Sequence, residues 1–531
     1  MKKFTFLALA AALLAGCCEK QEGYKYEYLY QNLQFDMPRV ERPVFADRTV
    51  KITDFGGVGD GIAMNTDAFA RAMESLSSQG GGTLVVPAGV WYTGPITVSS
   101  NVNLHLDKGA LVLFNPELDL YPIIDTWFEG WESKRCTSPI NARGAENIAI
   151  TGEGAFDGSG HMWRGVGRDR VNSLEWAWLG LQGGTIENDR YVPNGNRTRI
   201  RPVMVSLIEC KNVLLEDVLV QNSPNWTIHP LFCENLIIDG LTVRNPSWAA
   251  NGDGLDIESC KNVIVVDCTL DVGDDGVCIK SGKDKQGRDR GRPTENVLVD
   301  NCTVFKAHGG FVVGSEMSGG VRNVSVTNCK FLGTDVGLRF KSRRGRGGVV
   351  ENIYASNLSM VDLATEAVLF DLYYVGMSAA EVLAAGIEPG DKDTDPIPAV
   401  TEETPAFRNI YIKDVSCRNA YRAFYFNGLP EMNITNVNLE NCSITAVYGG
   451  ELCESDGVNL KDIYVEAQRG PALKLRNVKN LTLENYETKA GADTAFLIRG
   501  VRNANISLSS KTITAGNSQF DIEDTGVVTF K

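Results

Sequence analysis

Histidine is scarce in this chain, with four residues among 531, and no two cysteines are spaced as Cys-x-x-Cys. Metal sites of the zinc type are usually built from clustered His and Cys, so we expect no metal and no cofactor. The net charge of −14 argues against nucleic acid as a partner. Beyond the first twenty residues, no apolar run is long enough to span a bilayer.

The N-terminus has the pattern of an export signal. In MKKFTFLALAAALLAGCCEK, two lysines precede a short apolar run that ends in small residues. Leu14 to Cys17 spell LAGC, which looks like a bacterial lipobox, and the alternative is an ordinary signal peptide with a chance cysteine. We expect residues 1–17 to be the signal with a lipidated Cys17, followed by a tether over 18–47. The protein is then an exported lipoprotein, periplasmic or at the outer membrane or cell surface, held to the membrane only by lipid.

The remaining cysteines are expected in the interior. An exported protein can pair its cysteines. Six of these, however, fall inside repeated apolar units, which favours small buried hydrophobes instead. The six are Cys260, Cys268, Cys302, Cys329, Cys417 and Cys442.

A repeat organises the body of the chain. Segments such as KNVLLEDVLVQNS (from 211), ENLIIDGLTVRNP (from 234) and KNVIVVDCTLDVG (from 261) share one pattern, at spacings of roughly 23 to 34 residues. Short alternating strands separated by Asn, Asp or Gly at turns are typical of a parallel β-helix, whose Asn residues can stack into ladders. A β-propeller is the alternative, but its blades are longer.

One domain is expected over 48–531. Residues 65–82 predict an amphipathic helix that caps the first coil, with Asn65 or Thr66 as its N-cap. Two insertions interrupt the repeat, near 158–200 and 375–405. The second is expected to contain a short helix and an acidic, Pro-rich loop.

Two aspartate clusters lie about one coil apart. Asp253 stands in NGDG, and Asp274 and Asp275 stand in GDDG. His308 and then Arg339 and Lys341 follow in later repeats, so coil register would gather these residues into one outward-facing patch. The basic runs 280–292 and 339–348 flank the clusters, which suits an anionic substrate even though a charge run is usually just solvated.

Crowded carboxylates cannot all ionise cheaply, so one is expected to hold its proton. A protonated acid beside ionised bases is what glycoside hydrolysis requires. The alternative for Asp274 and Asp275 is an acidic turn, for His308 a structural histidine, and for Arg339 and Lys341 a solvated loop.

At these residues the sequence resembles the polygalacturonase family of glycoside hydrolases. The motifs are NGD (251–253), GDD (273–275), AHGG (307–310) and RFK (339–341), in the order of the family, and flanking text such as FGGVGDG (55–61) and SPNWTIHP (223–230) is also similar. The resemblance covers roughly residues 48–480. It implies a right-handed parallel β-helix that hydrolyses pectin with inversion. Departures at Gly252, Ala307 and Phe340 remove no functional group.

The resemblance also implies roles. Asp274 is expected to be the general acid, and Asp253 and Asp275 the bases that hold the attacking water. His308 would tune the acid, and Arg339 and Lys341 would bind the uronate carboxylate. Asp256 is expected to shape a turn, and Asp267 and Asp271 to lie outside the chemistry. Asn65-Thr66-Asp67 spells a family triplet but belongs to the capping helix.

Three alternatives compete with a polygalacturonase. A rhamnogalacturonan hydrolase of the same family tends to depart from the His and Arg-x-Lys motifs, which this chain keeps. A Ca²⁺-dependent pectate lyase would need six to eight oxygen ligands, whereas cations accompany these aspartates. A non-catalytic carbohydrate-binding lipoprotein is the third. Because the insertions can wall off one end of the cleft, we expect exo-action on pectic polymers that releases galacturonate.

Overall fold

A computed structural model describes residues 23–195, 199–387 and 390–531. The chain forms two compact units, Met1–Gln34 and Phe35–Lys531. The first contains a short 3-10 helix, η1 (Glu27–Tyr30), in its described part. Cys17 and the predicted signal lie outside the described residues. No described helix is long and apolar enough to cross a membrane.

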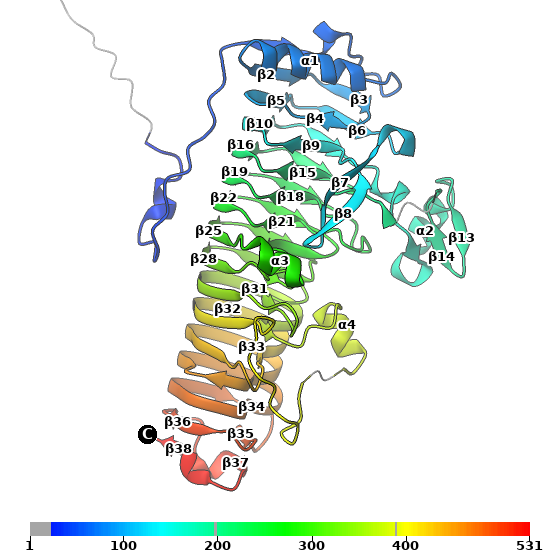
Figure 1. Ribbon diagram of the computed structural model, residues 1–531. Helices are drawn as coiled ribbons and strands as arrows, with labels where there is room; N and C mark the ends of the chain where they lie inside the picture. The colour runs from blue at the N-terminus through cyan, green and yellow to red at the C-terminus, as the bar shows by residue number, and fades with distance from the viewer. Residues whose placement is uncertain (1–22, 196–198, 388–389) are drawn as a thin grey trace, which may run out of the picture. The chain divides into compact units, whose positions relative to one another are not determined.

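The second unit is a parallel β-helix, as the repeat predicts (Figure 1). Its strands alternate buried and outward residues, and each pairs in parallel with the equivalent strand of the next coil. The apolar positions thus meet only by stacking, in one continuous core. In the segment before residue 48, Arg42 donates to both carboxylate oxygens of Glu216 at 2.6 and 2.7 Å.

Three faces make up each coil, and the strands of one face are in register along the stack. The first face contains β1 (Thr49–Lys51), β2 (Gly82–Val86), β5 (Val102–Leu106), β10 (Glu146–Gly152), β16 (Lys211–Glu216), β19 (Glu234–Asp239), β22 (Lys261–Val266), β25 (Thr294–Asp300) and β28 (Val321–Thr327). The second contains β3 (Gly89–Thr93), β6 (Ala110–Phe114), β11 (Ala155–Asp157), β17 (Leu219–Gln221), β20 (Thr242–Arg244), β23 (Thr269–Asp271), β26 (Thr303–Phe305) and β29 (Lys330–Leu332). The third contains β4 (Ile96–Thr97), β9 (Ile140–Arg143), β15 (Val205–Ile208), β18 (Ile228–Leu231), β21 (Leu255–Glu258), β24 (Asp275–Lys280), β27 (Gly309–Gly314) and β30 (Leu338–Lys341).

Later coils are nearly continuous strands. These are β31 (Val349–Asp371), β32 (Ala406–Asn427), β33 (Ile434–Asp456) and β34 (Asn459–Lys489). The stack ends with β35 (Phe496–Arg499), β36 (Ala504–Leu508), β37 (Ser518–Asp521) and β38 (Val528–Phe530).

The predicted asparagine ladder is present. Asn235, Asn262 and Asn296 have φ of 59°, 58° and 60°, and each amide donates to the Asn of the preceding coil. Asn tolerates this left-handed conformation better than most residues. The ladder therefore combines a tight turn with a hydrogen bond between coils. It contains Asn101, Asn147, Asn212, Asn235, Asn262, Asn296, Asn323, Asn352, Asn409 and Asn436.

The interior also holds the cysteines, as predicted. Eleven cysteines of the described residues are buried, and none of them is in a disulfide. Cys260 Sγ, for example, lies 3.3 Å from the carbonyl oxygen of Pro230 on the preceding coil. Desolvation raises the pKa of Cys278 well above its usual value, so this thiol stays protonated.

The capping helix is α1 (Thr66–Ser78), above the first coil in Figure 1. Its face of Ala68, Phe69, Ala72, Met73 and Leu76 is buried, as predicted. Asn65 occupies the N-cap position, as predicted, but its side chain makes no capping hydrogen bond. The Asn65 side chain accepts from Val58 N and donates to Val58 O, Ala63 O and Tyr92 O instead, while Thr66 Oγ1 accepts from Gly94 N. These two side chains fasten the helix to the neighbouring loops.

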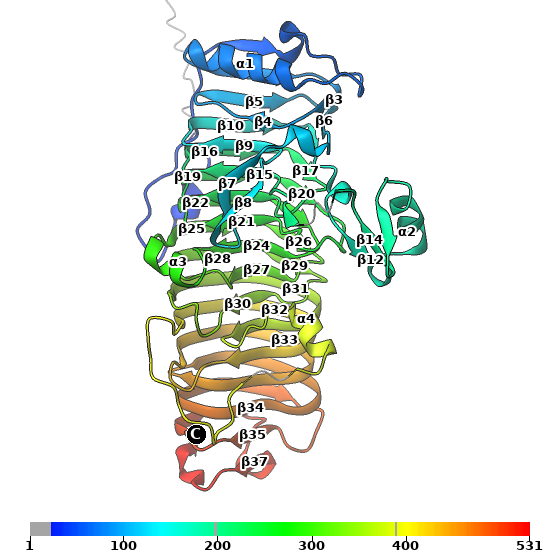
Figure 2. The ribbon, with the colours of Figure 1, turned by 45° about the vertical axis from the view of Figure 1, so that its right-hand side comes forward.

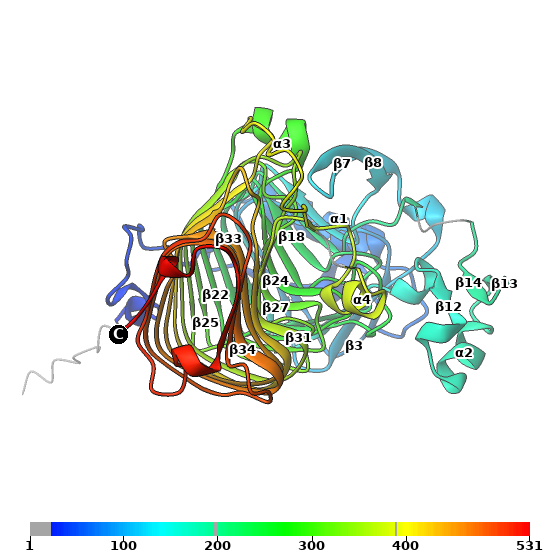
Figure 3. The same cartoon turned by 90° about the horizontal axis from the view of Figure 1, so that it is seen from below.

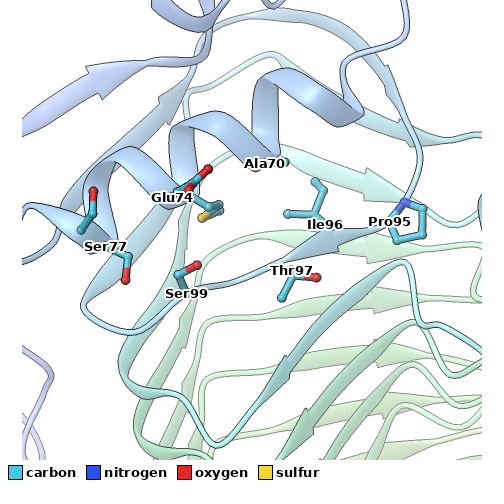
Figure 4. A pocket seen from close by; sticks show the side chains of 9 residues that line it. Ala70, Glu74, Ser77, Pro95, Ile96, Thr97 and Ser99 are labelled. Atoms are coloured by element: carbon cyan, nitrogen blue, oxygen red, sulfur yellow. The ribbon is translucent and has the colours of Figure 1, made fainter. Parts of the chain in front are cut away.

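A shallow hollow separates α1 from β4. Figure 4 shows Glu74 and Ser77 on the helix facing Thr97 and Ser99 on the strand side. Among the described residues that line it, none is a cation or a histidine. The hollow therefore offers little for acid–base chemistry, and the candidate site lies elsewhere.

The two insertions have their own structure. Residues 158–200 contain η4 (Gly160–Met162), η5 (Arg168–Arg170), α2 (Ser173–Leu179) and a small antiparallel sheet of β12 (Val166–Gly167), β13 (Thr185–Glu187) and β14 (Arg190–Val192). Residues 375–405 contain the predicted short helix, α4 (Ala379–Ala384). Two further elements have no counterpart in the sequence predictions: the hairpin β7 (Ile123–Phe128)–β8 (Trp131–Cys136) and the helix α3 (Asp284–Arg290). Viewed along the coils in Figure 3, β7–β8 and α4 lie outside the side that carries β18, β24 and β27.

Candidate active site

The outward positions of the third face form a layer of charged side chains. In β24, Val277 and Ile279 enter the core while Lys280 points the other way, and in β30 the core residues Leu338 and Phe340 alternate with two cations. Strand alternation places such side chains outside the core. Loops then bury them, so that Lys280, Arg339 and Lys341 are only 3%, 3% and 5% exposed.

Coil register stacks the candidate residues. Asp275 pairs with Gly309 of the next coil, and His308 N donates to the carbonyl oxygen of Asp274 at 3.0 Å. Gly254 N donates to the carbonyl oxygen of Asp275 at 2.9 Å. Asp253, Asp274, Asp275, His308, Arg339 and Lys341 consequently line one pocket of about 320 Å³.

Three carboxylates lie at the centre of this pocket. An oxygen from each of Asp253, Asp274 and Asp275 lies within 4.8 Å of the others. Asp274 is partly exposed, whereas Asp253 and Asp275 are 2% and 1% exposed. Asp274 is held in place by the backbone, because Oδ1 accepts from Asp275 N at 2.9 Å and Oδ2 from Asn251 N at 3.2 Å.

Asp275 is ion-paired on both oxygens. Lys341 Nζ lies 2.6 Å from Oδ2, and Arg339 Nη1 lies 3.3 Å from Oδ1. Burial alone would raise the pKa of Asp275, but Lys341 and Arg339 hold it well below its usual range. The negative charge of Asp275 is therefore neutralised by cations from a later coil.

The carboxyl groups with raised pKa values lie on the preceding coil instead. Burial, with the nearby charges of Asp256 and Asp274, raises the pKa of Asp253 well above its usual value. Burial also raises the pKa of Asp256 to about 8, although Lys280 Nζ at 3.5 Å opposes this. Asp256 was predicted to shape a turn, but it lies inside β21 and is fully buried. Alternation puts it on the outward side of that strand, beside the site.

His308 is paired with a residue that the sequence reasoning missed. Its Nδ1 lies 2.8 Å from Oδ2 of Asp335, one coil further on. Burial would lower the pKa of His308, but the hydrogen bond with Asp335 and the charge of Asp274 raise it. Coil register was the available signal, since Phe311 pairs with Leu338 and the same offset takes His308 to Asp335.

A second missed network supports the pocket. Lys280 Nζ lies 3.0 Å from Glu316 Oε2. Burial would raise the pKa of Glu316, but the charges of Lys280 and Lys341 outweigh burial and lower it to about 2. Beside it, Glu258 accepts from His229 at 2.9 Å and from Arg290 of α3 at 2.8 Å. These buried pairs fix the outward face of β21 and β24 on which the site rests.

Loops from three places complete the walls. Glu129 comes from the β7–β8 turn, Lys283 precedes α3, and the 375–405 insertion and the residues before it supply a group of neighbours. That group is Tyr374, Gly376, Met377, Ser378 and Glu381. The insertions are joined where Arg170 Nη2 meets Glu381 Oε1 at 2.9 Å.

The comparisons with known proteins agree with this geometry. The sequence profile of "Glycosyl hydrolases family 28" matches residues 83–393, more than half of the chain. The chain belongs to family 28 of the glycosyl hydrolases. It is a glycoside hydrolase with a parallel β-helix.

Two relatives and one crystal structure show what this family 28 hydrolase is similar to. It is 29% identical over 406 residues to a probable polygalacturonase of Vitis vinifera, covering 75% of this chain and 74% of the relative. It is 28% identical over 349 residues to an exo-poly-α-D-galacturonosidase of Dickeya chrysanthemi, covering 62% of this chain and 57% of that relative. A crystal structure of a hyperthermoactive exopolygalacturonase from Thermotoga maritima superposes with a TM-score of 0.64 at 33% identity, covering 79% of this chain and 93% of the other.

Metal binding is a separate question for this hydrolase. The oxygens of Asp253, Asp274 and Asp275 are close enough to contact one cation. Calcium takes six to eight oxygen ligands. Here Lys341 and Arg339 already contact both oxygens of Asp275, and Lys280 faces the same pocket. The donor set therefore fits a Ca²⁺ site poorly.

Proposed function

We propose that this enzyme hydrolyses α-1,4-galacturonosyl linkages of pectin. The observation that carries the proposal is the pocket itself, in which three aspartates face a pair of buried cations. Arg339 and Lys341 are the proposed partners of a sugar carboxylate at the cleaved bond, and planar Arg suits a carboxylate. Lys283, Arg343 and Arg346 line the same walls, and Lys283 is ion-paired with Glu129 at 3.4 Å.

Asp274 is the proposed general acid, because it is the most accessible of the three carboxyl groups. Asp275, kept ionised by Lys341 and Arg339, is the proposed base with Asp253, and the attacking water would lie between them. His308 would act on Asp274 through its charge. The raised pKa of Asp253 supports a competing assignment in which Asp253 holds the proton in the free enzyme. Replacing each aspartate separately distinguishes the two.

Inversion is the proposed stereochemistry, on the basis of the family resemblance. The spacing of the carboxyl groups favours a second candidate, retention of the anomeric configuration. Inverting glycosidases usually hold their carboxyl groups about 6.5–9.5 Å apart and retaining ones about 5–5.5 Å. Here one oxygen from each of the three aspartates lies within 4.8 Å of the others. Proton NMR of the first product formed decides, since inversion of an α-linkage releases the β-anomer and retention the α-anomer.

Exo-action is supported by the closed walls of the pocket. Met377, Ser378 and Glu381 of one insertion border it, and Arg170 ties the other insertion to Glu381. A chain end would enter such a pocket more easily than the middle of a polymer. Chromatography of early digests of polygalacturonate tests this. Galacturonate alone is expected, and a ladder of mid-length products would contradict exo-action.

The substrate assignment has a family alternative, rhamnogalacturonan. Retention of His308 and of the Arg339–Lys341 pair favours galacturonate at the cleaved bond. Parallel digests of polygalacturonate and rhamnogalacturonan test this choice. Release of reducing ends from rhamnogalacturonan only would contradict the proposed substrate.

Export and lipidation complete the proposal. The LAGC sequence supports a mature chain that starts at acylated Cys17, with a location on the periplasmic or outer surface of a bacterial membrane. Mass spectrometry of the N-terminal peptide from membranes is the test. A peptide that starts at Cys17 and carries acyl groups is expected, and an unmodified N-terminus at another residue would contradict lipidation.

A further inference from the structure

A second cavity lies beside the 158–200 insertion and outside the catalytic pocket. It has a volume of about 260 Å³. The lining comes from three second-face strands or their ends, from the loop after β20, and from the insertion, whose α2 lies to the side of the coils in Figure 2. The lining residues that matter here are Asp157, His161, Arg164, Trp178, Asn222 and Trp248.

Arg164 is the unusual member of this cavity. The residue is 2% exposed, and its Nε donates to the carbonyl oxygen of Gly160 at 3.3 Å. Nη1 and Nη2 have no hydrogen-bond partner among the described residues. Buried guanidinium groups are normally paired, because an unpaired buried charge is strongly unfavourable.

The carboxylate that lines the same cavity makes its hydrogen bonds with other residues. Asp157 lines the same cavity, but Oδ1 accepts from Ser159 N at 2.9 Å. Its Oδ2 accepts from the Gln221 and Asn222 amides at 2.9 and 2.7 Å. Burial and the neighbouring Arg201 lower the pKa of Arg164 to about 9, so the guanidinium is still charged at neutral pH.

Aromatic rings form part of the cavity lining. The Arg164 guanidinium lies 5.4 Å from the ring centre of Trp248, and the His161 ring lies 4.7 Å from that of Trp178. Trp178 is 43% exposed and marks the open side. Burial lowers the pKa of His161 to about 4, so at neutral pH its imidazole is neutral and can hydrogen-bond a hydroxyl group. Amphipathic rings beside a few convergent polar groups are typical of small-molecule sites.

The loop after β20 joins this cavity to the catalytic pocket. Trp248 belongs to the cavity, while Asn251 and Asp253, a few residues later, line the catalytic pocket. Arg201 connects the two sides, since it donates to the Asn251 side chain at 2.7 Å and its charge also acts on Arg164.

We infer that this cavity is an accessory binding site for one hexuronate residue. The carboxylate would pair with the free Nη1 and Nη2 of Arg164, the sugar face would pack on Trp178 and Trp248, and His161 and Asn222 would contact hydroxyl groups. The sugar is named on the strength of the proposed function. The binding chemistry itself depends only on this cavity.

Isothermal titration calorimetry with galacturonate tests the inference, using the full-length protein. Wild type is expected to bind two equivalents. Trp178→Ala and Arg164→Met are each expected to lose one of them, or to weaken it at least tenfold. Leu181→Ala, an 82% exposed neighbour of α2 outside the lining, is the matched control and should bind like wild type. Galactose, which has no carboxylate, should not bind at this site.

Lys341→Met separates the two sites, because it alters the catalytic pocket only. A single equivalent in wild type that is lost in Lys341→Met and unchanged in Trp178→Ala would overturn the inference, as would equal binding of galactose. If Arg164→Met fails to fold, the exposed Trp178→Ala decides. A galacturonate trisaccharide is also titrated into the inactive Asp274→Asn variant, with and without Trp178→Ala. If the site takes a residue of the polymer, Trp178→Ala weakens binding of the trisaccharide more than binding of the monomer. Turnover plays no part in these titrations, so failure to hydrolyse polygalacturonate is seen separately.

Discussion

Lys341 Nζ lies 2.6 Å from Asp275 Oδ2, although β30 and β24 are separated by β27. The long lysine side chain thus connects residues two coils apart and keeps Asp275 ionised. The proposed base and the proposed carboxylate-binding cation are therefore one buried unit. A substrate carboxylate that approaches Lys341 changes the field at Asp275 as well.

Lys341→Met is expected to impair this unit. Removal of one electrostatic contact in an active site typically lowers the rate by about 10²–10³-fold, so we expect a fall of that order in kcat/KM on polygalacturonate. Discrimination against methyl-esterified polymer should also shrink, because the ester lacks the charge that Lys341 recognises. Undiminished discrimination, measured on the two polymers side by side, would remove Lys341 from substrate binding.

Asp274→Asn is expected to abolish most turnover, by about 10²–10⁴-fold as for loss of a general acid. The matched control is Asp271→Asn, a half-buried change in β23 outside the pocket, which should retain wild-type activity. Reducing-end release from polygalacturonate measures both. If Asp253→Asn is inactive while Asp274→Asn still turns over, the acid is Asp253.

Asp335→Asn is expected to move the alkaline limb of the pH–rate profile to lower pH. Asp335 raises the pKa of His308, so the charged imidazole persists in the folded enzyme to a higher pH than in an ordinary histidine. The contribution of the charged His308 imidazole to the stability of the fold is complete below the unfolded pKa of about 6.5. It is lost as pH rises through the raised pKa of the folded state. A profile of kcat/KM against pH that is the same in both enzymes would exclude this role.

Chelation is expected to leave the activity unchanged. Arg339 and Lys341 occupy the oxygens of Asp275 that a Ca²⁺ ion would need. Treatment with EDTA should not reduce the release of reducing ends, and no unsaturated product should absorb at about 235 nm, whereas a Ca²⁺-dependent lyase gives the opposite result.

Asn262→Ala is expected to destabilise the stack. The substitution removes the hydrogen bonds to Asn235 and from Asn296. It also places Ala at a φ of 58°. Together these lower the free energy of unfolding by about 2–4 kcal/mol. Asn262→Gly keeps the backbone conformation and should lose less. Urea denaturation ranks the two, and equal stability of Asn262→Ala and wild type would show that the ladder contributes nothing.

The features that depend on the repeat could be predicted from the sequence. Alternating strands indicated the β-helix, Asn at turns indicated the ladder, and regular coil length brought Asp253 and Lys341 into one pocket. Asp335 was overlooked although the same register places it beside His308. Asp256 was assigned to a turn on the basis of the family resemblance, while alternation within β21 decides its position.

Departures from the repeat were not predictable in the same way. The β7–β8 hairpin and α3 have no periodic neighbours in the sequence, and their structure depends on contacts with the third face, such as that of Arg290 with Glu258. Asn65 and Thr66 have the residue types of an N-cap, yet tertiary hydrogen bonds with Val58 and Gly94 use their side chains instead.

The buried thiols give the coils individual reporters. Because the ten described cysteines from Cys210 to Cys453 are buried along the stack and are not joined by disulfides, a thiol reagent can reach each one only when its own coil opens. Labelling rates resolved peptide by peptide would thus measure local opening along the solenoid, and would show whether it unravels from one end or melts as a single cooperative unit.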